Sequence, residues 1–142
     1  MYDVQRMSKA IAEIEQYIEE IRKYRITSVQ DLKQDGKTRH ATAMLLFAVL
    51  NRMSDIGEEI MVKEKLGMPN QYTDIMPSLA KANVINSEQA DSLNKMMKKR
   101  NTLAHFYGEV TPNDVFILLE QLSSIEQFLT TIKKRILQKE KS

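Results

Sequence analysis

The segment TRHATAMLLFAVLNRMSDIGEEIMVKEK, residues 38–65, decides the fold of this chain. Its middle, Met44 to Leu50, is apolar on nearly every side of a helix, which predicts the most buried element of the molecule. Gly67 and Pro69 follow the segment, and this pair is typical of a helix end. We therefore predict a long central helix over residues 38–65.

Two amphipathic segments flank this helix in the sequence, and in each of them apolar residues recur three and four positions apart. They are Val4, Met7, Ile11, Ile14, Ile18 and Ile21 in the first segment, and Val115, Leu118, Leu122, Ile125, Leu129, Ile132 and Ile136 in the last. A fourth helix is expected from its cap Ser87 toward Leu103, with short helices near residues 28–31 and 75–82 and a loop at residues 34–37. The sequence predicts an all-α, up-and-down bundle of four to five helices, in a single domain spanning residues 1–142.

The composition supports this fold class and narrows the function. The 142 residues include only four Gly and three Pro, which favours long helices. The absence of Cys excludes a disulfide framework and a thiolate metal site. The first residues do not form a signal peptide, and the apolar run of residues 43–50 is far shorter than the roughly 20 residues of a membrane span. We expect a cytoplasmic protein without a membrane partner.

The charge balance predicts that any contact with a nucleic acid is local. Lys and Arg number 21 against 19 acidic residues, for a net charge of only +2. The densest basic stretch holds Lys95, Lys98 and Lys99 directly before Arg100. These three lysines are either a solvated helix face or candidates for contact with RNA.

The stretch from Arg100 to Tyr107 has the pattern R-x4-H-x-Y, with His105 between them. An imidazole can take or give a proton near neutral pH, and a guanidinium offers a forked, permanent charge for phosphate oxygens. These groups suit RNA cleavage without a metal, in which a 2′-hydroxyl loses a proton and the 5′-oxygen gains one. From the residues alone the alternative stays open that Arg100 is a surface cation and that His105 interacts with a helix dipole.

The spacing within this pattern favours a site shared by two chains. Residues five apart lie about 140° apart around a helix, so Arg100 and His105 do not share one face. Asn101 and His105, four apart, do. Either the helix ends near His105, or a second copy of the chain completes the site.

Several stretches together resemble one known family. Residues 51–60 are similar to the second-helix signature of the HEPN family, and residues 69–75 resemble its P-x-x-Y loop. Residues 96–107 resemble its R-N-x-x-x-H-x-Y core, and residues 115–128 fall where its last helix does. The sequence therefore resembles the HEPN family, specifically the HepT-like toxins of prokaryotic toxin–antitoxin pairs.

The resemblance implies a type VII-like toxin: a homodimeric endoribonuclease that needs no metal or other cofactor. It assigns the catalytic roles to Arg100 and His105, with Asn101 as a polar companion. It also implies that a cognate minimal nucleotidyltransferase, the antitoxin, adds AMP to Tyr107. Asp55 and Glu59 match the family only loosely and are candidates for supporting the catalytic residues. The alternative function is a non-catalytic module that binds a nucleotide or the partner nucleotidyltransferase.

Overall fold

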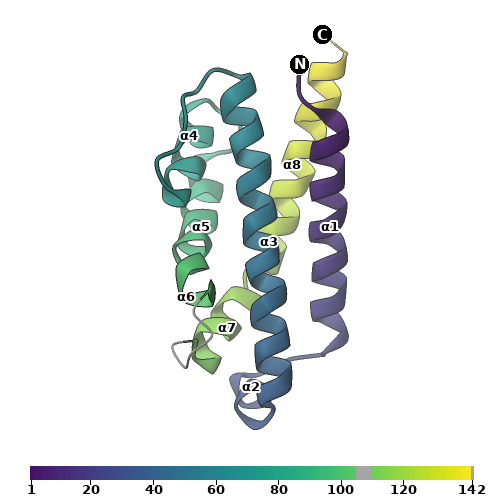
Figure 1. Ribbon diagram of the computed structural model, residues 1–142, viewed down its shortest axis with the longest axis vertical. Coiled ribbons are helices and arrows are strands. Elements are labelled where there is room, and N and C mark those ends of the chain that lie inside the picture. The colour runs from purple at the N-terminus through teal and green to yellow at the C-terminus, as the bar shows by residue number, and fades with distance from the viewer. Residues whose placement is uncertain (105–109, 142) are drawn as a thin grey trace.

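The computed structural model describes residues 1–104 and 110–141, and within these residues it contains helices and no strand. The longest helices are α1 (Val4–Lys23), α3 (Gly36–Lys63) and α8 (Leu122–Glu140), followed in length by α5 (Ser87–Lys98). Successive long helices run in opposite directions, and the N- and C-terminal ends lie together at one end of the bundle (Figure 1). The expectation of an all-α, up-and-down bundle is confirmed.

Shorter helices close the two ends of the bundle. They are α2 (Val29–Gln34), the 3-10 helix η1 (Tyr72–Asp74), α4 (Ile75–Lys81), α6 (Arg100–Ala104) and α7 (Pro112–Leu119). Helix α2 lies beside α7 at the end opposite the termini, and α4 packs against both α3 and α5. None of the described helices has the length and apolar character needed to cross a membrane.

Helix α3 is the centre of the molecule, as its sequence predicts. It packs against α1 on one side and against α4 and α6 on the other. Leu46, Val49, Leu50 and Met53 are at most 1% exposed. Burial of one such side chain stabilises the fold by roughly 1.5–3 kcal/mol.

Helix boundaries differ from the prediction where capping chemistry decides them. The cap of α5 is Asn86, not Ser87: its side chain accepts a hydrogen bond from the backbone N–H of Gln89 at 2.7 Å. The expected loop at residues 34–37 shrinks to Asp35, which caps α3 through the N–H of Thr38 at 3.1 Å. A side chain whose oxygen reaches the third amide of a helix can start that helix with almost no loop.

Two continuous helices of the prediction are each divided in the structure. The segment from residue 87 breaks at Lys99, and the C-terminal segment breaks at Gln121, so that α7 and α8 are separate helices. Both residues donate a backbone hydrogen bond to a carbonyl three positions earlier, Met96 for Lys99 and Leu118 for Gln121. Such tight turns redirect the chain without moving the apolar stripes away from the core.

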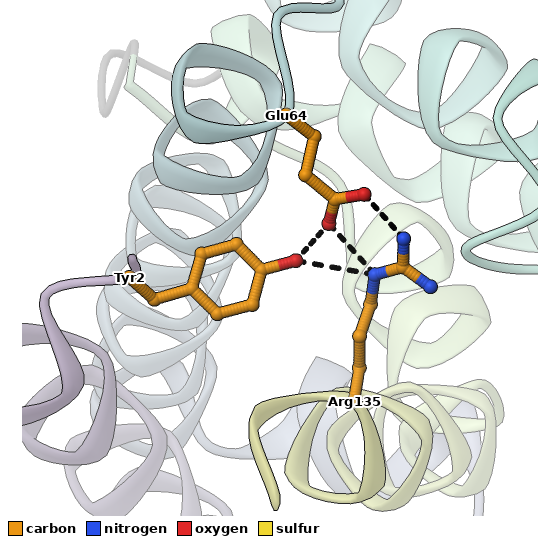
Figure 2. Close-up of polar contacts among 3 residues, drawn as sticks. All are labelled: Tyr2, Glu64 and Arg135. Carbon is orange, nitrogen blue, oxygen red and sulfur yellow. Dashed lines mark hydrogen bonds and ion pairs between the residues drawn. The ribbon is translucent and has the colours of Figure 1, made fainter. Parts of the chain in front are cut away.

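Long-range polar contacts join the ends of the long helices. Near the N-terminus, the hydroxyl of Tyr2 and the guanidinium of Arg135 both donate to the carboxylate of Glu64, and Arg135 Nε lies 2.7 Å from Glu64 Oε2 (Figure 2). Tyr2 precedes α1, Glu64 follows α3, and Arg135 belongs to α8. We call this group the terminal clip.

Candidate functional site

The side chain of Arg100, at the first position of α6, is held on three sides. Its guanidinium carbon lies 3.8 Å from the centre of the Tyr72 ring and 5.1 Å from the centre of the Phe47 ring. Its Nε donates to Asn51 Oδ1 at 2.6 Å. We call Arg100 with Phe47, Asn51 and Tyr72 the arginine cage.

The cage brings together three elements that are distant in the sequence. Phe47 and Asn51 are four residues apart and therefore lie on the same face of α3. Tyr72 is the first residue of η1, and the loop before it is fixed because the Asp74 carboxylate accepts from the N–H groups of Asn70 and Gln71 at 3.0 and 3.1 Å. The conformation of Arg100 is thus determined by α3 and η1 as well as by its own helix.

This geometry prepares a guanidinium to bind an anion. The aromatic rings attract the cation through their faces, a contribution of about 0.5–2 kcal/mol, and the bond to Asn51 fixes the guanidinium plane. Among the described residues, the only hydrogen bond of this guanidinium is the one from Nε. The terminal NH1 and NH2 groups form the fork that matches two oxygens of a phosphate.

The cage includes residues that sequence reasoning did not assign to the site. Phe47 was expected only in the apolar middle of the central helix, and Tyr72 only in the P-x-x-Y loop. A signal for Asn51 existed, because it begins a polar series with Asp55 and Glu59 at helical spacing. No local pattern could have shown that Tyr72 reaches Arg100 across 28 residues.

Both predicted supporting carboxylates contact groups other than Arg100. Asp55 Oδ2 lies 3.1 Å from Arg52 NH2 on the same helix. Glu59, 8% exposed, accepts from the N–H of Asp3 at 2.8 Å, close to the terminal clip. Among the described residues, neither carboxylate has a hydrogen bond or ion pair with Arg100.

The three candidate lysines line a groove between α5 and α7, with a volume of about 760 Å³. Glu88, Asp91 and the half-exposed Ile117 line the same groove, so its surface is of mixed charge and partly apolar. Lys99 Nζ is paired with Asp114 at 3.2 Å. Lys95 and Lys98 therefore remain the freer candidates for contact with RNA.

The Asp114 carboxylate links this groove to the start of α7. Desolvation acts to raise the pKa of Asp114, but the hydrogen bonds from Thr111 and Lys99 outweigh it and leave that pKa below its ordinary value of 3.8. Thr111 Oγ1 accepts from the Asp114 N–H at 3.1 Å, and the Thr111 N–H donates to the Asp114 carboxylate, which forms a capping box at the start of α7. Asp114 is thus ionised and committed to structural contacts near neutral pH.

Of the remaining predicted site residues, His105 and Tyr107 lie outside the described residues. Asn101 is exposed at the second position of α6. Among the described residues, no group of three or more His, Cys, Asp and Glu side chains is arranged to hold a metal ion.

The helical bundle and the arginine cage define a class of protein: a small α-helical domain in which the arginine of an R-x4-H motif is held between two aromatic rings. The model of the family described as "Ribonuclease HepT-like" matches residues 14–132. The chain belongs to this HepT-like family of the HEPN proteins.

Relatives of known name support the same assignment. The chain is 30% identical to the mRNA nuclease HepT of Shewanella oneidensis over 102 residues, which is 71% of this chain and 77% of that protein. It is 26% identical to the tRNA nuclease HepT of Aphanizomenon flos-aquae over 106 residues, 75% of this chain and 72% of that protein. Among solved structures, the tri-AMPylated Shewanella oneidensis HEPN toxin in complex with its MNT antitoxin matches with a TM-score of 0.83 and 28% identity, covering 94% of this chain and 99% of that one.

Proposed function

We propose that this chain is an endoribonuclease toxin that cleaves RNA without a metal ion, at a site formed by two copies of the motif from Arg100 to His105 in a homodimer. The observation that carries the proposal is the arginine cage. In a member of a ribonuclease family, the motif arginine is already oriented by Tyr72, Phe47 and Asn51 before any substrate binds.

The chemistry assigns one task to each group. The terminal nitrogens of Arg100 bind the phosphate oxygens and neutralise the charge that develops as the phosphorus becomes five-coordinate. The imidazole of His105 removes the proton from the ribose 2′-hydroxyl, and the 2′-oxygen forms a bond to phosphorus. The bond to the 5′-oxygen breaks, and that oxygen takes a proton from a second imidazole. The products are a 2′,3′-cyclic phosphate and a free 5′-hydroxyl.

The need for two imidazoles is the reason for proposing a homodimer. Each chain supplies one motif histidine, and one imidazole cannot accept and donate a proton in the same step. His40, the other histidine of the chain, is about 10 Å along α3 from Phe47, at 1.5 Å per residue, and cannot take this part. Asn101 accompanies the motif as a polar group. Glu59 supports the site by tying α3 to the segment before α1 through the N–H of Asp3, and Asp55 pairs with Arg52 within α3.

We further propose that a nucleotidyltransferase antitoxin silences the toxin by adding AMP to Tyr107. The support is the tri-AMPylated neighbour in complex with its MNT antitoxin. In this step the Tyr107 oxygen bonds to the α-phosphorus of ATP and pyrophosphate leaves. Each added phosphodiester brings a negative charge beside a cationic site and opposes RNA binding.

Cleavage assays with the purified, unmodified chain test the nuclease proposal. Wild-type protein in EDTA should release products with 2′,3′-cyclic phosphate ends, and His105→Ala and Arg100→Ala should each lower the rate at least about 100-fold. Arg25→Ala, which removes an exposed arginine, is the matched control and should cut RNA at the wild-type rate.

Three results would contradict parts of this proposal. If the unmodified wild-type protein leaves mRNA and tRNA intact, the chain is not a nuclease, and a module that only binds its partner would explain the fold. If EDTA stops cleavage, the reaction requires a metal. If Tyr107→Phe accepts as much AMP as wild type from ATP and the partner enzyme, Tyr107 is not the modified residue.

A further inference from the structure

A cationic cavity lies at the end of the bundle opposite the termini. It opens where α2 ends, α3 begins and α7 begins, and its volume is about 310 Å³. Its polar lining consists of Lys33, Arg39, His40 and Thr111, and small apolar groups complete the wall. Neither the motif nor the lysine groove includes these residues.

The lining of this cavity is positive, because the nearby acids are used elsewhere. No Asp or Glu lines it among the described residues. The Asp31 carboxylate accepts from Thr27 and Ser28, and the Asp35 carboxylate accepts from Thr38. The Asp114 carboxylate, behind Thr111, accepts from Thr111 and Lys99. The cavity therefore differs from the lysine groove, whose lining includes two carboxylates.

Arg39 is ordered before any ligand binds. Its NH1 donates to the backbone oxygen of Leu32 at 2.9 Å, which ties the first turn of α3 to α2. This bond limits the freedom that the side chain would otherwise lose on binding. Lys33 and His40 are exposed and can turn toward an anion.

The cavity and the arginine cage lie along one face of α3. At 100° per residue, Phe47 and Asn51 point within about 20° of the direction of His40. At 1.5 Å per residue, His40 is about 10 Å from Phe47 and about 16 Å from Asn51 along the axis. Met44, which points to the same side of α3 between them, is 60% exposed. This separation is too large for one phosphate group and suits two phosphates of one strand.

We propose that Lys33, Arg39 and His40 form a second phosphate-binding site, which holds a backbone phosphate of the RNA strand that Arg100 engages. The inference rests on the proposed function. It adds that the enzyme should prefer substrates longer than a dinucleotide, because only these reach both sites. The ligand class is a phosphate ester, and its source is the RNA chain and not a free nucleotide.

Binding of an uncleavable RNA tests the site separately from catalysis. The probe is a fluorescent, single-stranded 2′-O-methyl oligoribonucleotide, whose blocked 2′-oxygens cannot attack phosphorus. The double variant Lys33→Gln with His40→Gln should bind this oligomer about tenfold more weakly. The slope of the logarithm of the association constant against the logarithm of the salt concentration should become shallower by about 0.7 for each phosphate that the variant no longer binds. Lys37→Gln is the matched control, because Lys37 is exposed on the same turn of α3 but is not among the residues of the cavity.

Cleavage kinetics provide a second test of the same site. With a long RNA, the double variant should raise KM about tenfold at unchanged kcat, whereas a dinucleotide should be cut equally by variant and wild type. Thermal unfolding of the double variant should match that of Lys37→Gln, because both variants change only exposed side chains.

The outcomes separate this inference from the proposed function. If the double variant binds the oligomer as tightly as the Lys37→Gln control, the second site is wrong, even when the protein cleaves RNA. If the oligomer effect is present but no RNA is cut, the site stands and the nuclease proposal fails. If AMP alone binds wild type as tightly as the oligomer does, and the double variant does not bind it, the ligand is a nucleotide and the RNA assignment is overturned.

Discussion

At the scale of single residues, the arginine cage orders Arg100, the proposed catalytic cation, before any substrate binds. A free arginine side chain loses up to about 2 kcal/mol of conformational freedom when a ligand fixes it. In this chain, two aromatic rings and the Asn51 side chain already hold Arg100. If Arg100 acts as proposed, a larger share of the phosphate interaction is available for stabilising the transition state.

The ring of Tyr72, and not its hydroxyl, should carry this effect. We expect Tyr72→Phe to keep kcat/KM for RNA cleavage within about twofold, because the ring face over Arg100 is preserved. Tyr72→Ala should lower kcat/KM about tenfold, which corresponds to about 1.4 kcal/mol of weaker positioning. Steady-state kinetics with both variants measure the difference.

A merely structural role for Tyr72 would give a different result. It would lower the melting temperature of Tyr72→Ala while leaving kcat/KM unchanged. Equal losses in Tyr72→Phe and Tyr72→Ala would assign the effect to the hydroxyl.

How much of the site the sequence predicts depends on how local its contacts are. Arg100, Asn101 and His105 are contained in one short motif, and chemistry together with the family resemblance is enough to select them. Phe47 and Tyr72 reach Arg100 only through the tertiary fold. Nothing in an apolar run marks the one aromatic ring that faces a cation, so the cage required the structure.

At the scale of helices, the apolar period predicts which segments are helical better than it predicts where they end. The stripe from Val115 to Ile136 is continuous in sequence, yet the chain turns at Gln121, beside the weak helix formers Ser123 and Ser124. Likewise α3 ends at Lys63 with Glu64 as its cap, and the turn beyond it is made by Lys65 at a φ of 58°, two residues before Gly67. Backbone hydrogen bonds within a single turn decide where these helices end. The spacing of the apolar residues does not show where such turns occur.

Gly57 shows how closely two helices approach each other. A Cβ added at this buried position of α3 would overlap with Cγ2 of Ile75 on α4. Ala for Gly inside a helix would otherwise add up to about 1 kcal/mol of stability. We expect the clash, roughly 1–3 kcal/mol, to exceed this gain, so that Gly57→Ala lowers the free energy of unfolding in a urea titration.

A second variant identifies the cause. Gly57→Ala combined with Ile75→Ala removes the overlapping methyl group, so the two losses should be less than additive. If the losses of unfolding free energy in the two single variants simply add in the double variant, Ile75 is not the neighbour that excludes a larger side chain at position 57.

At the scale of the whole molecule, the terminal clip joins the segment before α1 to α3 and α8. The side chains of Arg135 and Glu64 are only 21% and 12% exposed, so solvent screens this pair less than a more exposed ion pair of α8, Lys133 with Glu15. The hydrogen bond to Glu64 raises the pKa of Arg135 above its ordinary value. The clip therefore acts as a charged contact shared by three segments.

Neutralising the clip should destabilise the bundle. We expect Glu64→Gln to lower the free energy of unfolding by about 2 kcal/mol, because it leaves a partly buried guanidinium without its counter-charge. Glu15→Gln is the matched control, since it makes the same change in an exposed pair and should cost at most about 1 kcal/mol. Urea titrations of both variants give the comparison, and equal losses would mean that burial of the clip adds nothing.

The stability of the molecule should fall in acid. The pKa values of Asp31, Asp35 and Glu126 are lowered by hydrogen bonds from Thr27, Thr38 and Arg22 respectively, and that of Asp114 is lowered as well. A carboxyl whose pKa is lower in the folded state stabilises that state fully above its ordinary pKa. This contribution is lost as the pH falls below the ordinary values of 3.8 and 4.5 and then through the folded ones.

Melting temperatures between about pH 6 and about pH 3 measure this loss. The melting temperature should be nearly constant at the upper end and should drop steeply below about pH 4.5. A Glu126→Gln variant should show a shallower drop, because one of the linked groups is gone. A flat profile down to the lowest pH would contradict the role assigned to these carboxyls.

The arginine cage also offers a position for a fluorescent reporter of substrate binding. The chain contains no Trp, so Tyr72→Trp would place its single indole against the Arg100 guanidinium, with the ring type that interacts best with a cation. When NH1 and NH2 of Arg100 bind a phosphate, the charge next to that indole changes, so its emission should change in intensity and wavelength. Substrate capture could then be followed in real time by stopped-flow fluorescence, without a label on the RNA.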